Sequence, residues 1–441
     1  MKTIGGILAV LAALMSVLVA APSPTGAAKP PQYFVDEDTL PFDALPGHDT
    51  ERLWGVHKGA GYRIEVPADW NGDLVVWAHG FRGDGLELTV DNGPLREYLI
   101  ANGYAWAASS YARNSYDVAT GVQDTHALTM LFNGKVGKPD QRFLIGASMG
   151  GHITGVAIEQ YPNLFDGAMP VCGVMGDYEL FDYFLDVNVT AQALAGVDSG
   201  FPVPDDYTTN DVPAIKAALE GFPGTFPFTL NATGEQWKNL VEIESGGERP
   251  VFDQGFLLWN GFAGDFLFGL GEGDGTLPRS PGVALDNTDA IYQLDFDPAI
   301  STEEIALNDA VTRVEADRNG RNRNGLAQVP PVNGNIRVPV LTMHTLGDLF
   351  VPFVMQQAYA DRVASNGASD LLVQRAIRDV GHCAFSDQEW EQGFADLVDW
   401  VETGVRPNGD DVFATSADTY GCAFTVPDRN PFGPLGIAAC P

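Results

Sequence analysis

The chain has 441 residues, enough for one large domain or two ordinary ones, and its hydrophobic share of 45% is that of a globular protein. It carries 58 acidic residues against 25 basic ones, which gives a formal charge of −33. A surface this negative repels nucleic acids and anionic lipids, so we expect neither a nucleic acid nor a membrane as a partner.

The first 28 residues have the pattern of an export signal. Lys2 precedes an apolar run from Ile4 to Ala21, and small residues follow the run up to Ala28. This order is typical of a secretory signal peptide that is cleaved near Ala28. An uncleaved membrane anchor is the alternative, because the run is marginally long enough to span a bilayer. We therefore expect residues 1–28 to be removed and the protein to be secreted, either extracellular or periplasmic.

From about residue 48, short β-type runs alternate with longer helical patterns. The predicted strands are 62–66, 73–78, 104–109, 142–146, 167–171, 338–344 and 371–377. The predicted helices between them are 121–132, 149–160, 353–365 and 387–403. Several of the strands are nearly continuous apolar runs, as expected where both faces of a strand are buried. This alternation predicts an α/β fold with a mostly parallel sheet and helices on both of its faces.

The alternation stops between residues 175 and 336. This stretch is rich in Phe, Gly and Asp, and only 213–219 and 302–316 have a helical pattern. A structureless insertion of that length is improbable in a compact protein, so we predict an inserted cap or lid domain. Residues 29–174 and 337–404 would then form the two parts of the core, followed by a C-terminal extension, 405–441.

An aromatic stretch at 252–262, with Phe266 and Phe268 beyond it, lies inside the predicted cap. It is either the apolar wall of an acyl or aryl pocket or the core of the cap itself.

The pentapeptide Gly146-Ala147-Ser148-Met149-Gly150 has the pattern G-x-S-x-G. A predicted strand leads into it and a predicted helix leaves it, which is the context of a nucleophile elbow. In such an elbow the serine backbone is strained and its hydroxyl projects above the sheet. We therefore predict Ser148 as a catalytic nucleophile, with an ordinary glycine-rich turn as the alternative.

A serine hydroxyl needs a neighbouring base, and of the seven histidines His382 has the expected place. It lies in a loop directly after the last predicted strand, whereas His152 and His344 lie within a predicted helix and a predicted strand. We predict that His382 accepts the serine proton and that hydrolysis rises with pH near the ordinary histidine pKa of about 6.5.

The base in turn needs a carboxylate that fixes its tautomer. Asp348 follows the penultimate predicted strand and is the predicted acid. Asp177, after the strand that follows the elbow helix, and Asp379, close to His382, are the alternatives.

The oxyanion of a tetrahedral intermediate needs two backbone N–H donors. Met149, at the start of the elbow helix, is the first predicted donor. The second is Phe81, in the His79-Gly80-Phe81 loop after an early strand, where Gly80 lets the loop turn over the site.

These motifs resemble those of the α/β-hydrolases over residues 50–175 and 336–404. The matching features are the His-Gly-Phe loop, the elbow at Ser148 and the chain order serine, aspartate, histidine. The resemblance implies an eight-stranded, mostly parallel sheet with the site above the carboxyl ends of the strands, and a cap inserted after the strand that follows the elbow helix. The segments Gly347–Pro352 and Gly381–Cys383 also resemble secreted bacterial esterases and amidases, among them the phthalyl amidases.

Cys383 beside the histidine is similar to the arrangement in tannases and feruloyl esterases, where a disulfide ties the histidine loop to the elbow. Those enzymes have a cysteine directly before the serine, whereas Ala147 stands there in this chain.

Four cysteines in an exported chain suggest two disulfides. Cys422 and Cys440 would close a short C-terminal loop, which leaves Cys172 with Cys383, although all three pairings are possible. The alternative for Cys172 and Cys383 is two buried thiols.

The expected function is hydrolysis of a carboxylic ester or an activated aryl amide through an acyl-serine intermediate. The substrate could be a small molecule or a polymer, no metal or other cofactor is expected, and the expected state is a monomer. An amidase specific for phthalyl groups, an acyltransferase and a non-catalytic binding protein on the same fold are the alternatives.

Overall fold

The computed structural model describes residues 32–221, 229–262, 266–427, 437 and 440. The predicted signal peptide, 1–28, lies outside the described residues. None of the described helices is both long and apolar enough to cross a membrane.

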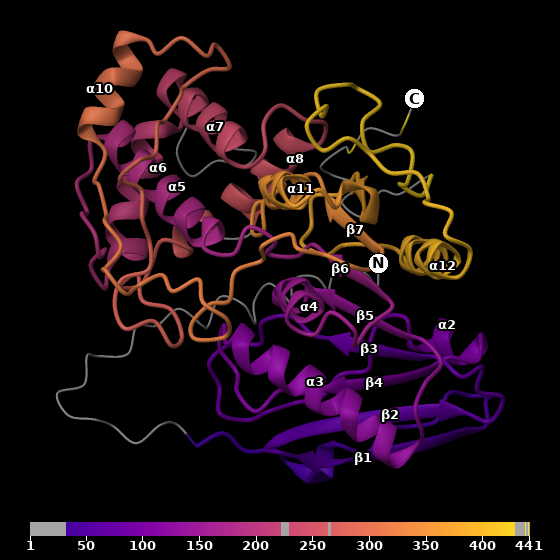
Figure 1. The fold of residues 1–441 in the computed structure, drawn as a ribbon. Helices are drawn as coiled ribbons and strands as arrows, with labels where there is room; N and C mark the ends of the chain where they lie inside the picture. The colour runs from indigo at the N-terminus through magenta and orange to yellow at the C-terminus, as the bar shows by residue number, and fades with distance from the viewer. Residues whose placement is uncertain (1–31, 222–228, 263–265, 428–436, 438–439, 441) are drawn as a thin grey trace.

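In the described part of the chain, one sheet of eight strands forms the centre of the fold, in the order β1-β2-β4-β3-β5-β6-β7-β8 (Figure 1). The strands are β1 (Thr50–His57), β2 (Ala60–Pro67), β3 (Leu74–Ala78), β4 (Ala105–Ser109), β5 (Arg142–Ala147), β6 (Gly167–Val171), β7 (Val340–Thr345) and β8 (Leu372–Ile377). The pairs β1–β2 and β2–β4 are antiparallel, and every other neighbouring pair is parallel. The predicted mostly parallel, eight-stranded sheet is therefore confirmed.

Helices cover both faces of this sheet. They are α2 (Arg96–Ala101), α3 (Val118–Lys135), α4 (Met149–Gln160), α11 (Val354–Ser365) and α12 (Asp387–Thr403). One apolar cluster joins α3, α4 and α11 to one face of the sheet, through side chains such as Leu74 and Val76 of β3. A second cluster joins α2 and α12 to the opposite face, where Val75 points. The alternation of side chains along each strand thus supplies both cores.

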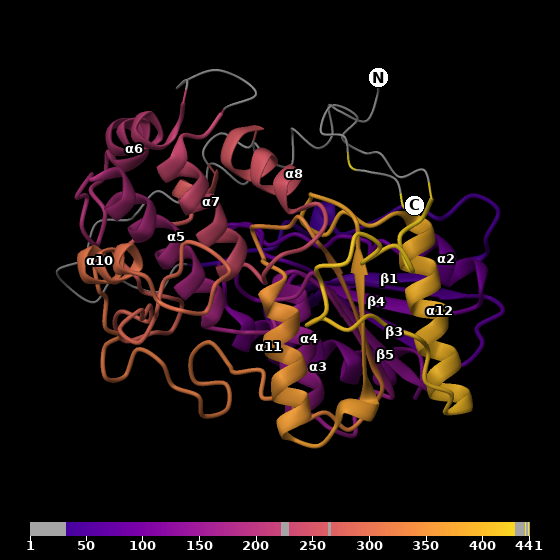
Figure 2. The same cartoon turned by 90° about the horizontal axis from the view of Figure 1, so that it is seen from above.

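Residues 175–336, here called the inserted segment, connect β6 to β7 and lie at one side of the sheet (Figure 2). Their helices are α5 (Glu179–Ala195), α6 (Val212–Leu219), α7 (Ala232–Glu244), α8 (Phe252–Leu257), α9 (Phe266–Gly269) and α10 (Thr302–Ala310), with a π-helical turn, η3 (Leu258–Phe262), between α8 and α9. An apolar cluster of these helices includes Leu346, Leu349 and Val380 from the core. The inserted segment is thus packed on the loops that follow β7 and β8.

The extent of one predicted helix is wrong. The pattern predicted a helix through residue 316, but α10 ends at Ala310 and Val311 is already extended. The chain leaves the helix to bond Asn287, whose backbone N–H donates to the Val314 carbonyl and whose side-chain oxygen accepts from the Val314 N–H. These tertiary bonds outweigh the helical propensity of the sequence.

Candidate active site

The turn between β5 and α4 has the geometry of a nucleophile elbow. Ser148 has φ 60° and ψ −125°, a conformation that non-glycine residues rarely adopt. The turn is so tight that a Cβ on Gly146 would overlap the carbonyl oxygen of Gly150, and a Cβ on Gly150 would overlap that of Ala78. The two glycines of the motif are therefore required by the close approach of strand, helix and neighbouring loop.

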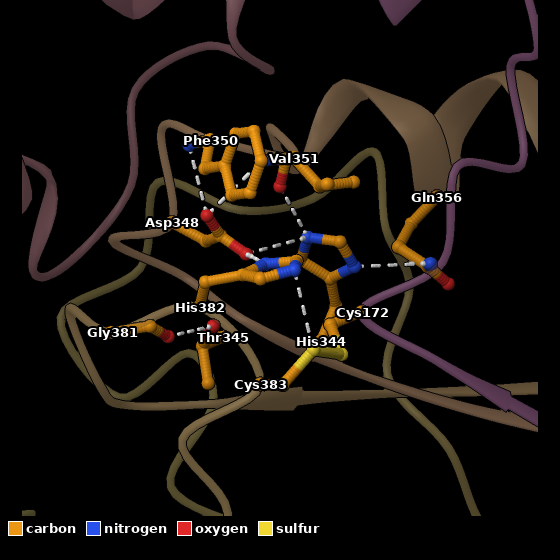
Figure 3. Close-up of a disulfide and its surroundings, with 10 residues drawn as sticks. All are labelled: Cys172, His344, Thr345, Asp348, Phe350, Val351, Gln356, Gly381, His382 and Cys383. Atoms are coloured by element: carbon orange, nitrogen blue, oxygen red, sulfur yellow. Dashed lines mark hydrogen bonds and ion pairs between the residues drawn. A yellow bond between two sulfur atoms is a disulfide. The ribbon is translucent and has the colours of Figure 1, made fainter. Parts of the chain in front are cut away.

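His382 and Asp348 lie on adjacent loops and contact each other directly (Figure 3). His382 Nδ1 is 2.6 Å from Asp348 Oδ2. Asp348 is fully buried, and its other oxygen accepts backbone hydrogen bonds from Phe350 (2.9 Å) and Val351 (3.1 Å). With Asp348 Oδ2 accepting the His382 Nδ1–H, the ring keeps its lone pair on Nε2.

The alternative acids are occupied elsewhere. Asp177 is buried in ion pairs with Arg362 (2.6 Å) and Arg323 (3.1 Å) and accepts the Val332 N–H. Asp379 accepts the backbone N–H of Gly381. Asp177 therefore links the start of the inserted segment to its end and to α11.

Two further histidines are buried and neutral. Burial lowers the pKa of both His152 and His344 to about 4. His344 Nε2 lies 2.8 Å from the Val351 carbonyl and Nδ1 lies 3.2 Å from the Gln356 amide nitrogen, so both ring nitrogens are used. Neither histidine has a free nitrogen with which to activate a serine.

Ser148 and His382 are not hydrogen-bonded to each other within the described residues. His382 Nε2 instead lies 3.4 Å from Cys383 Sγ. A disulfide sulfur has no proton, and Nε2 has none in this tautomer, so the contact is not a hydrogen bond and the Nε2 lone pair stays available. Such contacts between nucleophile and base often tighten only when a substrate is bound.

The His79-Gly80-Phe81 loop lies directly against the elbow. A Cβ on Gly80 would be 3.1 Å from Ser148 Cβ and 3.2 Å from the Ala147 carbonyl. In the described part of the chain, the N–H groups of Phe81 and Met149 donate no hydrogen bond to a protein acceptor. Both predicted donors are thus unused beside the serine.

The chain contains two disulfides, Cys172–Cys383 and Cys422–Cys440. Cys172 directly follows β6, and Cys383 directly follows His382. The first bond therefore ties the loop that carries His382 to the carboxyl end of a central strand. Among the described residues, Cys172, His382 and Cys383 are the one group whose ligand atoms lie close enough together to hold a metal ion. The disulfide excludes metal binding there, because neither sulfur is a thiolate.

A cavity of about 260 Å³ opens beside Ser148. Its walls are mainly aromatic and aliphatic and come from the core and the inserted segment: Phe81, Tyr116, Ser148, Val174, Leu180, Phe181, Phe184, Leu185, Phe201, Phe266, Leu270, Leu277, Leu285, Phe350 and Val351. The charged side chains among the described lining residues are Asp84, Glu272 and Asp274, and none is basic.

The aromatic stretch at 252–262 mostly forms packing within the inserted segment. Phe252, Phe256, Trp259 and Phe268 are buried in its apolar cluster, whereas Phe266 also lines the cavity. Both interpretations of the stretch therefore hold, each for different residues.

Sequence reasoning missed two buried polar side chains beside the acid loop. Arg249 Nε donates to the Leu346 carbonyl (2.8 Å), and Trp259 Nε1 donates to two carbonyls of the acid and base loops. Burial lowers the pKa of Arg249 to about 10, so its guanidinium stays charged at neutral pH. No motif marks either residue, because their partners are backbone carbonyls far away in the sequence.

The sheet order, the elbow after β5, and the Asp348–His382 pair on the loops after β7 and β8 together define an α/β-hydrolase fold. No protein-family model matches the chain.

The chain is similar to an o-phthalyl amidase from Xanthobacter agilis, with 23% identity over 414 residues, 81% of this chain and 89% of the relative. Among solved structures it is similar to feruloyl esterase B from Aspergillus oryzae, at a TM-score of 0.49 and 14% identity over 82% of each chain. A second esterase from the same fungus aligns with a TM-score of 0.47 and 14% identity, over 88% of this chain and 86% of its own.

Proposed function

We propose that the protein is a secreted serine hydrolase that cleaves carboxylic esters or activated aryl amides through an acyl-serine intermediate. The observation that carries the proposal is the contact between buried Asp348 and half-buried His382, 2.6 Å apart, on loops beside a strained serine that faces an apolar cavity. The similarity to an o-phthalyl amidase supports the same class of reaction.

The roles follow from the atoms that are available. His382 Nε2 accepts the Ser148 proton as Oγ attacks the carbonyl carbon, and Asp348 stabilises the imidazolium that forms. The N–H groups of Phe81 and Met149 stabilise the oxyanion. His382 then protonates the leaving alcohol or amine, and in the second half it activates the water that releases the acid from Ser148.

The first test is the identity of the nucleophile. Ser148→Ala should lower kcat by several orders of magnitude without changing the unfolding temperature, because only a surface hydroxyl in the cavity is removed. A fluorophosphonate label should attach to Ser148 in the native protein, as read by mass spectrometry, and should be absent from the variant. Labelling of another serine, or full activity of Ser148→Ala, would disprove the mechanism.

The lining of the cavity gives the substrate class. Seven of the described lining side chains are aromatic, and they favour a flat apolar acyl group: Phe81, Tyr116, Phe181, Phe184, Phe201, Phe266 and Phe350. An anionic acyl group would meet Asp84, Glu272 and Asp274 without a basic partner among the described lining residues. We therefore infer that neutral aryl acyl groups are preferred over those with a free carboxylate.

The second test compares substrates that differ in charge. A neutral aryl ester such as p-nitrophenyl benzoate should have a higher kcat/KM than a phthalate monoamide or a mono-aryl phthalate, and a short aromatic polyester tests substrate size. When the mono-aryl phthalate is the mono-p-nitrophenyl ester, comparing it with the benzoate keeps p-nitrophenol as the leaving group in both reactions. Glu272→Gln should raise kcat/KM for the anionic ester several-fold and leave the neutral ester unchanged, since it removes one repulsive charge.

Asp370→Asn is the matched control, because Asp370 is exposed before β8, at the opposite end of that strand from the base loop. Asp370→Asn should leave kcat/KM unchanged for both the neutral and the anionic ester. A preference for the anionic ester would show that this charge argument is wrong while leaving the serine mechanism in place.

A further inference from the structure

One indole N–H in the inserted segment bonds both of the loops that carry the acid and the base. Trp259 lies on η3 and is buried, with 2% of its surface exposed. Its Nε1 donates to the Gly347 carbonyl at 3.0 Å and to the Val380 carbonyl at 2.9 Å. Gly347 directly precedes Asp348, and Val380 is two residues before His382.

The neighbouring carbonyls of these loops have their own donors. Leu346 accepts from Arg249 Nε (2.8 Å), Asp379 from the Gly347 N–H (2.9 Å) and Gly381 from Thr345 Oγ1 (2.8 Å). For the Gly347 and Val380 carbonyls, Trp259 is the one donor within the described residues. Loss of its N–H would leave two buried acceptors unpaired on the two loops that hold the acid and the base.

The ring of Trp259 also supports the base through packing. It contacts Phe350, with 6.3 Å between ring centres, and Phe350 in turn contacts the His382 ring at 4.9 Å. One turn earlier, Gly255 of α8 lies so close that a Cβ would overlap the Gly347 carbonyl. The backbones of α8 and of the Asp348 loop are therefore in direct contact, and this loop cannot shift without displacing α8.

We propose that Trp259 is a positioning residue that fixes the spacing of the Asp348 and His382 loops, so that this part of the inserted segment belongs to the active site. The inference rests on the proposed serine mechanism. A displacement of about 1 Å between reacting groups can cost on the order of 100-fold in rate, so a small loosening of the two loops should be visible in kcat.

The test compares two buried tryptophans of the inserted segment. Trp259→Phe keeps an aromatic ring and removes the shared N–H, and we expect kcat on a neutral aryl ester to fall about 10- to 100-fold with KM unchanged. Trp237→Phe is the matched control, because Trp237 is also buried and its Nε1 donates to the Val187 carbonyl (3.2 Å) on α5, away from the acid and base loops. We expect Trp237→Phe to lower the unfolding temperature similarly and to leave kcat unchanged.

Equal kcat values for the two variants would overturn the proposal. If Trp259→Phe does not fold, 3-benzothienylalanine at position 259, which has the shape of tryptophan without the N–H, gives the same two outcomes. Failure of the serine mechanism itself is separate, because it appears as full activity of Ser148→Ala or as a fluorophosphonate label elsewhere.

Discussion

At the scale of single residues, burial decides which ionisable groups remain available for chemistry. His79 is also buried, and desolvation lowers its pKa well below the ordinary value, as for His152 and His344. These three rings are neutral at pH 7 and are held by backbone or side-chain partners. His382 differs because its Nδ1 bonds a carboxylate and its side chain remains 15% exposed.

Asp124 gives a pH test of the same principle away from the active site. It is buried on α3, where desolvation raises its pKa from 3.8 to about 6, although it accepts the Ala112 N–H. A raised pKa means that the folded state binds the proton more tightly than the unfolded chain. Protonated Asp124 therefore stabilises the folded state relative to the charged form. This contribution is complete below pH 3.8 and is lost as the pH rises through 6.

Asp124→Asn should remove that pH dependence, which amounts to about 3 kcal/mol for a shift of roughly two pKa units. The difference in unfolding temperature, Asp124→Asn minus native, should be a few degrees larger at pH 8 than at pH 4. Thermal unfolding at both pH values measures this difference, with the exposed Asp370→Asn as the control for loss of one charge. A difference that does not change with pH would contradict the assigned titration.

The residues that could be predicted from the sequence are those whose geometry follows from neighbours along the chain. Ser148 is identified by flanking glycines, and His382 and Asp348 by the strands that precede them. Trp259 and Arg249 could not be predicted, because they act through carbonyls 88 and 97 residues away in the sequence. Only the packing of the inserted segment brings these partners together.

At the scale of elements, the buried strands and the regular core helices were predicted best. β6, α4 and α12 have the predicted bounds, since continuous apolar runs and capping residues define them locally. β1 was not predicted as a strand. It is an edge strand whose residues are exposed or half-buried throughout, so it lacks the apolar run of a central strand.

The helices of the inserted segment were the least predictable elements. α5 and α7 were not predicted, although α5 is buried along most of its length. α5 packs against α6, α7, α9 and α10, so apolar residues occur on several of its sides and no single stripe marks it. Its buried Asn188 is satisfied by a tertiary partner, because the Tyr207 hydroxyl donates to the Asn188 side-chain oxygen.

At the scale of the whole molecule, the candidate site is assembled from distant parts of the chain. Ser148 and the His79-Gly80-Phe81 loop precede the inserted segment, Asp348 and His382 follow it, and the described cavity wall belongs largely to it. The Cys172–Cys383 bond joins the two core parts across a sequence separation of 211 residues. A covalent tie of this length restricts the unfolded chain strongly and also fixes the loop next to His382.

Replacing both cysteines of this bond by serine should therefore affect stability and catalysis together. By the loop-entropy relation, Cys172→Ser/Cys383→Ser should cost roughly 5 kcal/mol in the free energy of unfolding, against roughly 3 kcal/mol for Cys422→Ser/Cys440→Ser, whose separation is 18 residues. Denaturant unfolding measures both losses. Only the first variant should also lower kcat, because Cys383 Sγ lies 3.4 Å from His382 Nε2 and its loop would lose the tie to β6. An unchanged kcat in Cys172→Ser/Cys383→Ser would mean that Trp259, Thr345 and packing hold the base loop without the disulfide.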